Sequence, residues 1–114
     1  MKFDGQTHHD PAATNTKVLL GDGARYLHAV DAYNGAGAAG AFVQFFDAAD
    51  VDDVVLGTTA PHWALPVPKG GGNAPIYPTP IGFELGIVVA VTSTVGGAGA
   101  PGTPLVLSVR HGRA

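Results

Sequence analysis

Cysteine is absent from the 114 residues of this chain, and charged residues are scarce. Without cysteine, disulfide bonds, thiol catalysis and cysteine-ligated zinc are all excluded. Charged residues make up only 13% of the chain, and its six Lys and Arg residues are scattered, so there is no basic stripe to neutralise nucleic-acid phosphates. We therefore expect no nucleic-acid partner, and the net charge of −3 agrees with this.

Long apolar runs are also missing. A membrane-spanning helix needs about 20 consecutive apolar residues, and the β-branched run at residues 81–94 is too short and too rich in Val and Thr for one. The first ten residues lack the apolar segment of a secretory signal. We therefore expect no membrane partner.

What the chain does contain favours strands. Residues 81–94 carry one charge, Glu84, and are closed by Gly96-Gly97, which is typical of a strand buried on both faces. The 17 glycines and nine prolines favour short strands joined by turns over helices. The predicted fold is all-β: a single antiparallel β-sandwich, jelly-roll-like, with about seven or eight strands, formed by one domain over residues 15–114.

Turn signals and alternation set the strand boundaries. The other strands are expected at residues 16–20, 25–33, 41–46, 62–68, 76–83 and 104–111, and residues 54–56 form a short apolar piece after an acidic connector. Asn34-Gly35 predicts that the strands on either side of it form an antiparallel hairpin. Alternation in residues 25–33 does not identify the core side, and we favour the face that carries Val30. Pro66 and Pro68 place their strand at a sheet edge.

Residues 1–14 are polar and aperiodic. We expect them to form an extended N-terminal arm that packs weakly on its own domain and is either disordered or lies on a neighbouring molecule.

The spacing of Gly35, Gly37 and Gly40 matches that of a dinucleotide-binding loop. That motif binds pyrophosphate where it opens a helix, whereas here it precedes the strand-like residues 41–46. A hairpin loop is therefore favoured over a phosphate site.

An acidic turn at residues 47–53 carries Asp47, Asp50, Asp52 and Asp53, whose carboxylates suit calcium. It lacks the glycine bend and the closing Glu of an EF-hand loop, so a solvated connector is favoured, and metal binding there stays open.

Histidines offer further metal donors. His8-His9-Asp10 has groups suited to a transition metal shared between symmetry-related arms, although a flexible polar tail is favoured. No pattern in the sequence brings together His28, His62 and His111.

Residues for hydrolysis are few. Ser93 ends a strand and Ser108 lies within one, and neither occupies the Gly-x-Ser-x-Gly turn that exposes a nucleophile. Paired carboxylates for glycoside cleavage would have to come from Glu84 and an aspartate, and an inter-subunit or backbone hydrogen-bonding role is at least as plausible for Glu84. We assign no catalytic, cofactor-binding or metal-ligating residue, and we predict that the protein is not an enzyme.

The aromatic residues and the low charge both point toward partners. A sugar-stacking platform could be built from Trp63, Tyr26, Tyr33 and Tyr77, although aromatics in small β-proteins more often lie in cores or interfaces. A surface with so few charges is expected to be partly covered by partner subunits.

Three segments carry a family resemblance. They are residues 26–49, with a strand ending in Asn34, a small-residue turn and an aromatic strand; residues 63–68, an apolar strand ending Pro-Val-Pro; and residues 81–94, with the sequence Gly-Ile-Val-Val-Ala. Over residues 17–111 the chain resembles small β-proteins encoded among the structural genes of tailed bacteriophages. Glu84-Leu85 stand where that group often has Ser-Thr.

The resemblance implies a non-enzymatic virion protein, a capsid decoration or cement protein that forms a homo-oligomer, expected to be a trimer. Its partners would be copies of itself and the major capsid protein or other virion proteins, and it would be made in the host cytoplasm and located on the particle surface. The alternative is a tail fibre, spike or baseplate module that recognises host-surface glycan through Trp63 and the tyrosines. A small hydrolase receives little weight.

Overall fold

The computed structural model describes residues 4–35 and 39–113. Its elements are β1 (Asp4–Ala13), β2 (Val18–Asp22), β3 (Arg25–Tyr33), β4 (Ala41–Asp47), the short 3₁₀ helix η1 (Val51–Asp53), β5 (Trp63–Val67), β6 (Gly72–Asn73), β7 (Ile76–Phe83), β8 (Gly86–Thr92) and β9 (Leu105–Arg113). Within the described residues, no helix has the length and apolarity needed to cross a membrane.

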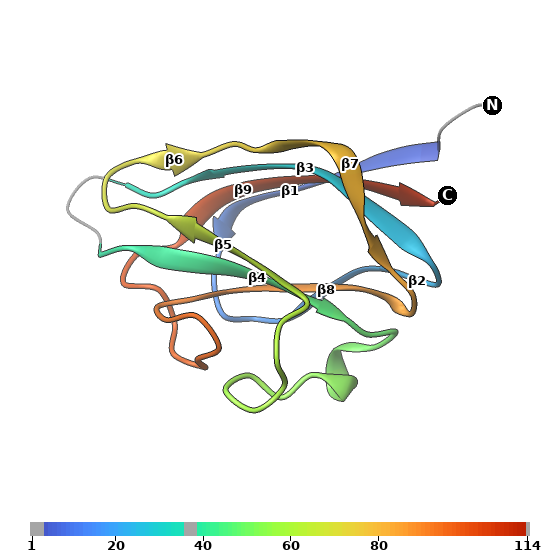
Figure 1. The fold of residues 1–114 in the computed structure, drawn as a ribbon. Coiled ribbons are helices and arrows are strands. Elements are labelled where there is room, and N and C mark those ends of the chain that lie inside the picture. The colour runs from blue at the N-terminus through green and yellow to red at the C-terminus, as the bar shows by residue number, and fades with distance from the viewer. Residues whose placement is uncertain (1–3, 36–38, 114) are drawn as a thin grey trace.

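The strands form two antiparallel sheets that pack face to face (Figure 1). In the sheet we call sheet A the order is β1-β9-β3, and β6 and β7 both pair with β3 along its other side. In sheet B the order is β2-β8-β4-β5. The predicted all-β sandwich is confirmed, with nine described strands of which β6 has only two residues.

The core lies between the two sheets. Leu27 and Leu107 of sheet A meet Val43, Phe45 and Ile87 of sheet B in one apolar cluster, and all five are at most 1% exposed. Each of these large side chains contributes about 1.5–3 kcal/mol through removal from water.

Strand β8 is buried on both faces, as predicted, since every residue from Gly86 to Thr92 is buried. Ile87 points into the main core, whereas Val88 packs on the opposite face in a second cluster with Phe46 and Val54. The segment 81–94 is nevertheless two strands, because its first residues belong to β7 in sheet A.

The chain passes from β7 to β8 through a turn held by Asp47. Its carboxylate accepts hydrogen bonds from the backbone N–H groups of Glu84, at 3.2 Å, and Leu85, at 2.8 Å. Gly86 follows with φ +150°. A Cβ there would lie 2.6 Å from the carbonyl oxygen of Ala48, so the close approach of backbones requires glycine.

The predicted hairpin between β3 and β4 is wrong. β3 belongs to sheet A and pairs with β9, whereas β4 belongs to sheet B and pairs with β5 and β8. Asn34 does not form a tight turn: it is buried, its N–H donates to the carbonyl of Gly71 and its side-chain amide donates to the carbonyl of Ala39. Asn34 therefore follows the last residue of a sheet A strand, and the chain enters sheet B at Ala41.

A β-bulge explains why alternation left the core side of β3 open. The pairing register of β3 shifts between Leu27 and Ala29. Leu27 is buried before the shift and Val30 after it, although the two are three residues apart. An extra residue in one strand reverses the side-chain phase, so the favoured Val30 face is the core face only beyond the bulge, and Tyr26 points to solvent.

The expectation that the N-terminal residues pack only weakly on their own domain is wrong for residues 4–13. They form β1, which pairs with β9 from Asp4 opposite Arg113 to Ala13 opposite Leu105. Backbone pairing at a sheet edge does not require apolar side chains, so a polar sequence can still form a strand. The predicted edge position of residues 62–68 is confirmed by β5.

Replacing Gly86 by Ala is expected to lower the free energy of unfolding by about 2–4 kcal/mol, because the new Cβ would meet backbone atoms at a positive φ. Gly102→Ala is the matched control, since a Cβ there meets nothing within 4 Å, and its effect should stay within about 0.5 kcal/mol. Urea denaturation of both variants measures the difference. Equal stability of the two would contradict this account of the β7–β8 crossing.

Candidate functional site

The two outer faces of the sandwich differ. The centre of the sheet B face is covered by residues 48–59 and 93–99, which Figure 1 shows on the side away from sheet A. Gln44, fully buried, donates to the hydroxyl of Thr92 at 2.5 Å and accepts from the N–H of Gly96 at 3.1 Å. The ammonium group of Lys17 donates to the carbonyl of Val54 at 2.6 Å and so fixes the end of η1.

The outer face of sheet A presents apolar side chains of its own strands to solvent, whereas on the other side the exposed apolar residues Val55 and Val95 belong to the covering loops. Tyr33 is 52% exposed and Val106, its partner in the β3–β9 pairing, is 42% exposed. Ile76 at the start of β7 is 79% exposed. Exposed apolar side chains that share one uncovered face are candidates for burial against a partner.

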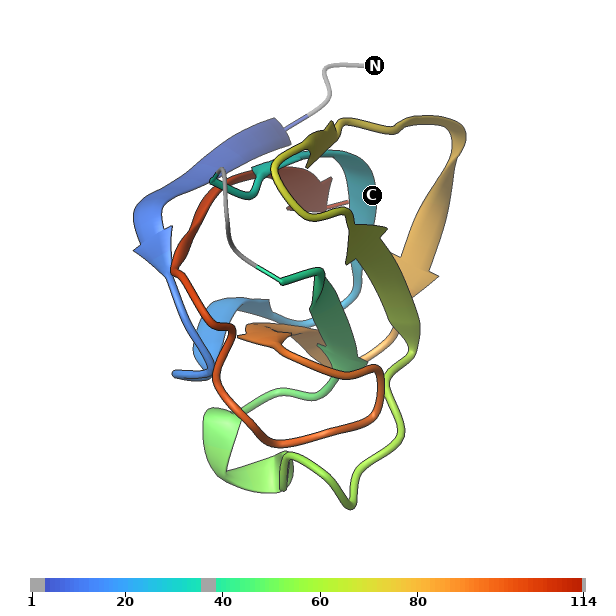
Figure 2. The same cartoon turned by 90° about the vertical axis from the view of Figure 1, so that its left-hand side faces the viewer.

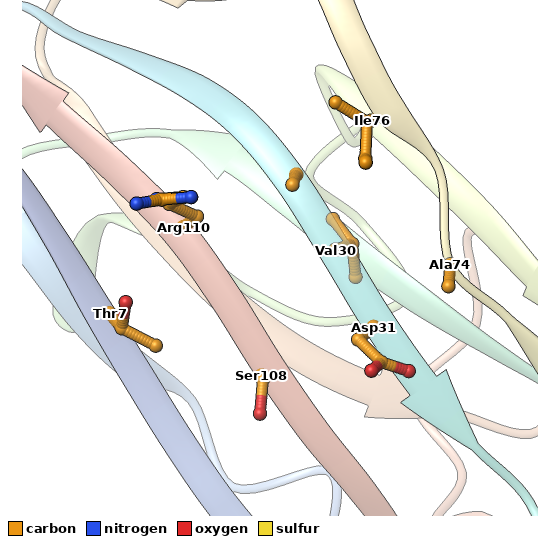
Figure 3. Close-up of a pocket in the computed structure, with 8 residues that line it drawn as sticks. Thr7, Val30, Asp31, Ala74, Ile76, Ser108 and Arg110 are labelled. Carbon is orange, nitrogen blue, oxygen red and sulfur yellow. The ribbon is translucent and has the colours of Figure 1, made fainter.

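A shallow groove of about 480 Å³ runs across this face (Figure 3). It is lined by Thr7, Ala29, Val30, Asp31, Ala74, Ile76, Ser108 and Arg110. In the pairing register Arg110 lies opposite both Thr7 and Ala29, and Asp31 lies opposite Ser108. The groove therefore offers a cation and an anion at separate points beside the aliphatic wall of Ile76, an arrangement that suits a partner surface of mixed polarity.

The structure brings together a serine and a histidine that the sequence had not linked. His9 Nδ1 lies 2.7 Å from Ser108 Oγ across β1 and β9. Because β9 runs between β1 and β3, Asp31 lies beyond the serine and not beyond the histidine, so its carboxylate is not placed to orient the imidazole as a catalytic triad requires. We interpret the pair as a cross-strand hydrogen bond.

His28 and His111, which the sequence did not connect, lie close to each other and to His8 on three adjacent strands. His111 is 2% exposed, and its Nδ1 has no hydrogen-bond partner among the described residues. Burial lowers the pKa of His111, and Arg25, His8 and His28 lower it further. His62 is elsewhere: its Nε2 lies 2.9 Å from the carbonyl oxygen of Gly82.

The described residues contain no group of three or more His, Asp or Glu side chains arranged to hold a metal ion. In the acidic turn, Asp50 instead caps η1 by accepting from the N–H of Asp52 at 3.0 Å. Asp47 is engaged by the β7–β8 turn described above. Asp10 accepts from the N–H of Ala12 at 3.0 Å.

The four aromatic residues considered for a sugar-stacking platform do not lie together in the structure. Trp63 and Tyr77 meet edge to face, with ring centroids 5.8 Å apart, and the indole N–H donates to the tyrosine hydroxyl at 2.9 Å. Burial raises the pKa of Tyr77, and the bond from Trp63 counteracts this in part. This pair joins β5 of sheet B to β7 of sheet A, whereas Tyr26 and Tyr33 face outward on sheet A. The four do not form one flat surface.

In the described part of the chain, the other residues considered from the sequence lie in loops and turns that form no site. Gly37 of the dinucleotide-like spacing lies outside the described residues, and Gly35 and Gly40 flank the passage between the sheets. Ser93 is an exposed residue just after β8, and Glu84 is exposed in the β7–β8 turn. The groove residues Asp31, Ile76 and Arg110 were missed, since the bulge in β3 hides which side chains face outward together.

Comparisons of the chain with protein-family models, with curated proteins and with solved structures found no match.

The lowered pKa of His111 predicts that acid destabilises the fold. The unfolded histidine titrates near 6.5, above the folded value, so below about pH 6.5 the unfolded chain binds more protons and the free energy of unfolding falls with pH. His28 contributes with the same sign. Urea denaturation at pH 5 and pH 7.5 should therefore show lower stability at pH 5.

The variant His111→Leu should show a smaller difference between the two pH values, because one of the titrating groups is gone. His62→Gln is the control, since His62 is exposed and its ring contacts the carbonyl of Gly82 in β7 and not His111, and it should keep the wild-type difference. A pH dependence that His111→Leu leaves unchanged would contradict the assignment.

Proposed function

We propose that this protein is a non-enzymatic structural protein of a phage particle, a capsid decoration or cement protein that binds through the outer face of sheet A. The observation that carries the proposal is the contrast between the two outer faces. Sheet B is covered by the chain's own loops, whereas sheet A leaves Tyr33, Ile76 and Val106 in solvent. The resemblance of residues 17–111 to phage structural proteins supports the choice of assembly.

The mechanism is mechanical. A protein that lies across the boundary between capsid subunits stabilises the shell by burying apolar surface on both, at about 25 cal/mol per Å², and by resisting their separation. A stable contact needs about 800 Å² from each partner, so the exposed apolar residues would form its centre. Asp31 and Arg110 would set the orientation of the partner more than the affinity.

The surroundings of the candidate nucleophiles support a role without catalysis. Ser108 lies within the paired part of β9, so its neighbouring backbone belongs to the strand ladder and offers no preorganised oxyanion site. Glu84 lies in the β7–β8 turn, where its backbone N–H donates a hydrogen bond to the carboxylate of Asp47.

A second candidate function is recognition of host-surface glycan by a tail fibre, spike or baseplate module. It is favoured by the groove itself, where the side chains of Thr7, Asp31 and Ser108 offer hydrogen-bonding groups beside Ile76. Copy number separates the two functions. A decoration protein is present in hundreds of copies and stays on tail-less heads, whereas a receptor-binding module is scarce and binds host cells.

A double variant, Ile76→Lys with Val106→Lys, should bind purified heads that lack this protein at least about tenfold more weakly than the wild type, because two ammonium groups would have to lose water in the contact. The matched control is Val55→Lys, since Val55 is 57% exposed but lies on the loop that covers sheet B. Co-sedimentation with heads measures the binding, and circular dichroism confirms the fold.

Equal binding by the double variant and the wild type would refute the assignment of the outer face of sheet A. Loss of binding by Val55→Lys alone would place the contact on the other side of the sandwich.

A further inference from the structure

Three of the four sheet edges carry features that prevent another strand from pairing. On the β5 edge, Pro66 lies within the strand and Pro68 follows it. On the β6–β7 edge, β6 has only two residues and β7 contains Pro78 and Pro80. On the β2 edge, the strand has five residues and its register shifts between Leu19 and Gly21. Proline removes an N–H donor, and short or bulged strands give an incoming strand little to pair with.

The fourth edge, β1, is different. The strand has ten residues and lies at the border of sheet A, where in the described part of the chain β9 is its only partner (Figure 2). At its first residue the strand carries the charged Asp4, and near its other end Pro11 lies within the strand and the register shifts between Asp10 and Ala13. Before that point the pairing with β9 is regular from residue 4 to residue 10.

The middle of β1 also lacks the charges that keep edges apart. Residues 5–9 are Gly-Gln-Thr-His-His, with no Pro, Lys, Arg, Asp or Glu. Successive residues of a strand direct their N–H and C=O groups to opposite sides, so alternate residues of this stretch present free backbone groups at the edge. Natural proteins block such stretches where self-pairing is harmful, and this chain blocks its other edges.

We propose that β1 pairs with β1 of a second copy of this chain, antiparallel about a two-fold axis, so that the two A sheets become one continuous sheet. An antiparallel arrangement of identical strands satisfies both free edges at once. In the register centred on Thr7, Gln6 lies opposite His8 of the partner subunit and Thr7 opposite Thr7 of the partner subunit. The two Thr7 hydroxyls can hydrogen bond to each other, and over residues 5–9 no carboxylates or ammonium groups oppose each other. At each end of this register Asp4 lies opposite Asp10 of the partner subunit, so the pairing is expected to be strongest over residues 5–9.

The contact would also bring the two grooves together, because Thr7 lines the groove on the outer face of sheet A. The inference does not depend on the proposed function, since it concerns an edge and not a face. If the protein failed to bind heads, the proposed β1 pairing would still stand. If β1 did not pair with a second copy, the proposed contact through the outer face of sheet A would still stand.

Amide hydrogen exchange of the full chain tests the proposal. Exchange and native mass spectrometry are measured together from micromolar to millimolar concentration. The expected result is a dimer, or a larger even-numbered species, with alternate amides of residues 5–9 becoming protected as it forms. A monomer at every concentration, or an oligomer in which these amides exchange as fast as in the monomer, would overturn the proposal.

Thr7→Glu provides a second test, because in the dimer two carboxylates would face each other across the axis, whereas in the monomer the exposed side chain lies opposite Arg110 and is tolerated. Dimerisation should weaken at least tenfold relative to the matched control Thr7→Gln. Circular dichroism establishes that both variants fold. Equal dimerisation by the two folded variants would overturn the two-fold pairing through β1.

Discussion

The burial of β8 on both faces is the constraint on which the rest of the structure depends. Ile87 faces the core that joins the two sheets, while Val88 faces away from it and needs a separate cover. That cover is supplied by the chain itself, through the loops that follow β4 and β8. The loops are held by two polar side chains, Gln44 and Lys17, which hydrogen bond to the loop backbone at Gly96 and Val54.

The loops that cover the outer face of sheet B are not available to cover the outer face of sheet A. Most of the described residues outside strands lie over sheet B or connect the sheets, so sheet A meets solvent with Tyr33, Ile76 and Val106 exposed. The edge strands differ in a similar way. Prolines or register shifts interrupt β5, β7 and β2, but in β1 they occur only near one end. The face and the edge that remain open belong to the same sheet. The proposed assembly through sheet A rests on this placement of the loops and of the edge-blocking features.

Composition and periodicity were sufficient to predict the fold class, and Pro66 and Pro68 correctly predicted that β5 lies at a sheet edge. They could not determine which strands are neighbours: the Asn34-Gly35 pair indicates a turn, but the partners of β3 and β4 are set by contacts distant in sequence. The bulge at residues 27–29 reversed the side-chain phase within one strand, which hid the groove. Strand β1 could not be recognised from apolar alternation, because its residues are polar and backbone hydrogen bonds to β9 hold it in the sheet. The proximity of His8, His28 and His111 likewise depends on strand order, which spacing does not encode.

Hydroxyl-radical footprinting of the free and the assembled protein tests the central claim most directly, that the outer face of sheet A is the surface covered by partners. Tyr33 and Ile76 report on that face, and Val55 and Val95 report on the loops over sheet B, with all four well exposed in the isolated chain. The account predicts that oxidation of Tyr33 and Ile76 falls on assembly while that of Val55 and Val95 is unchanged. Protection of Val55 and Val95, with Tyr33 and Ile76 still oxidised at their free rates, would contradict it.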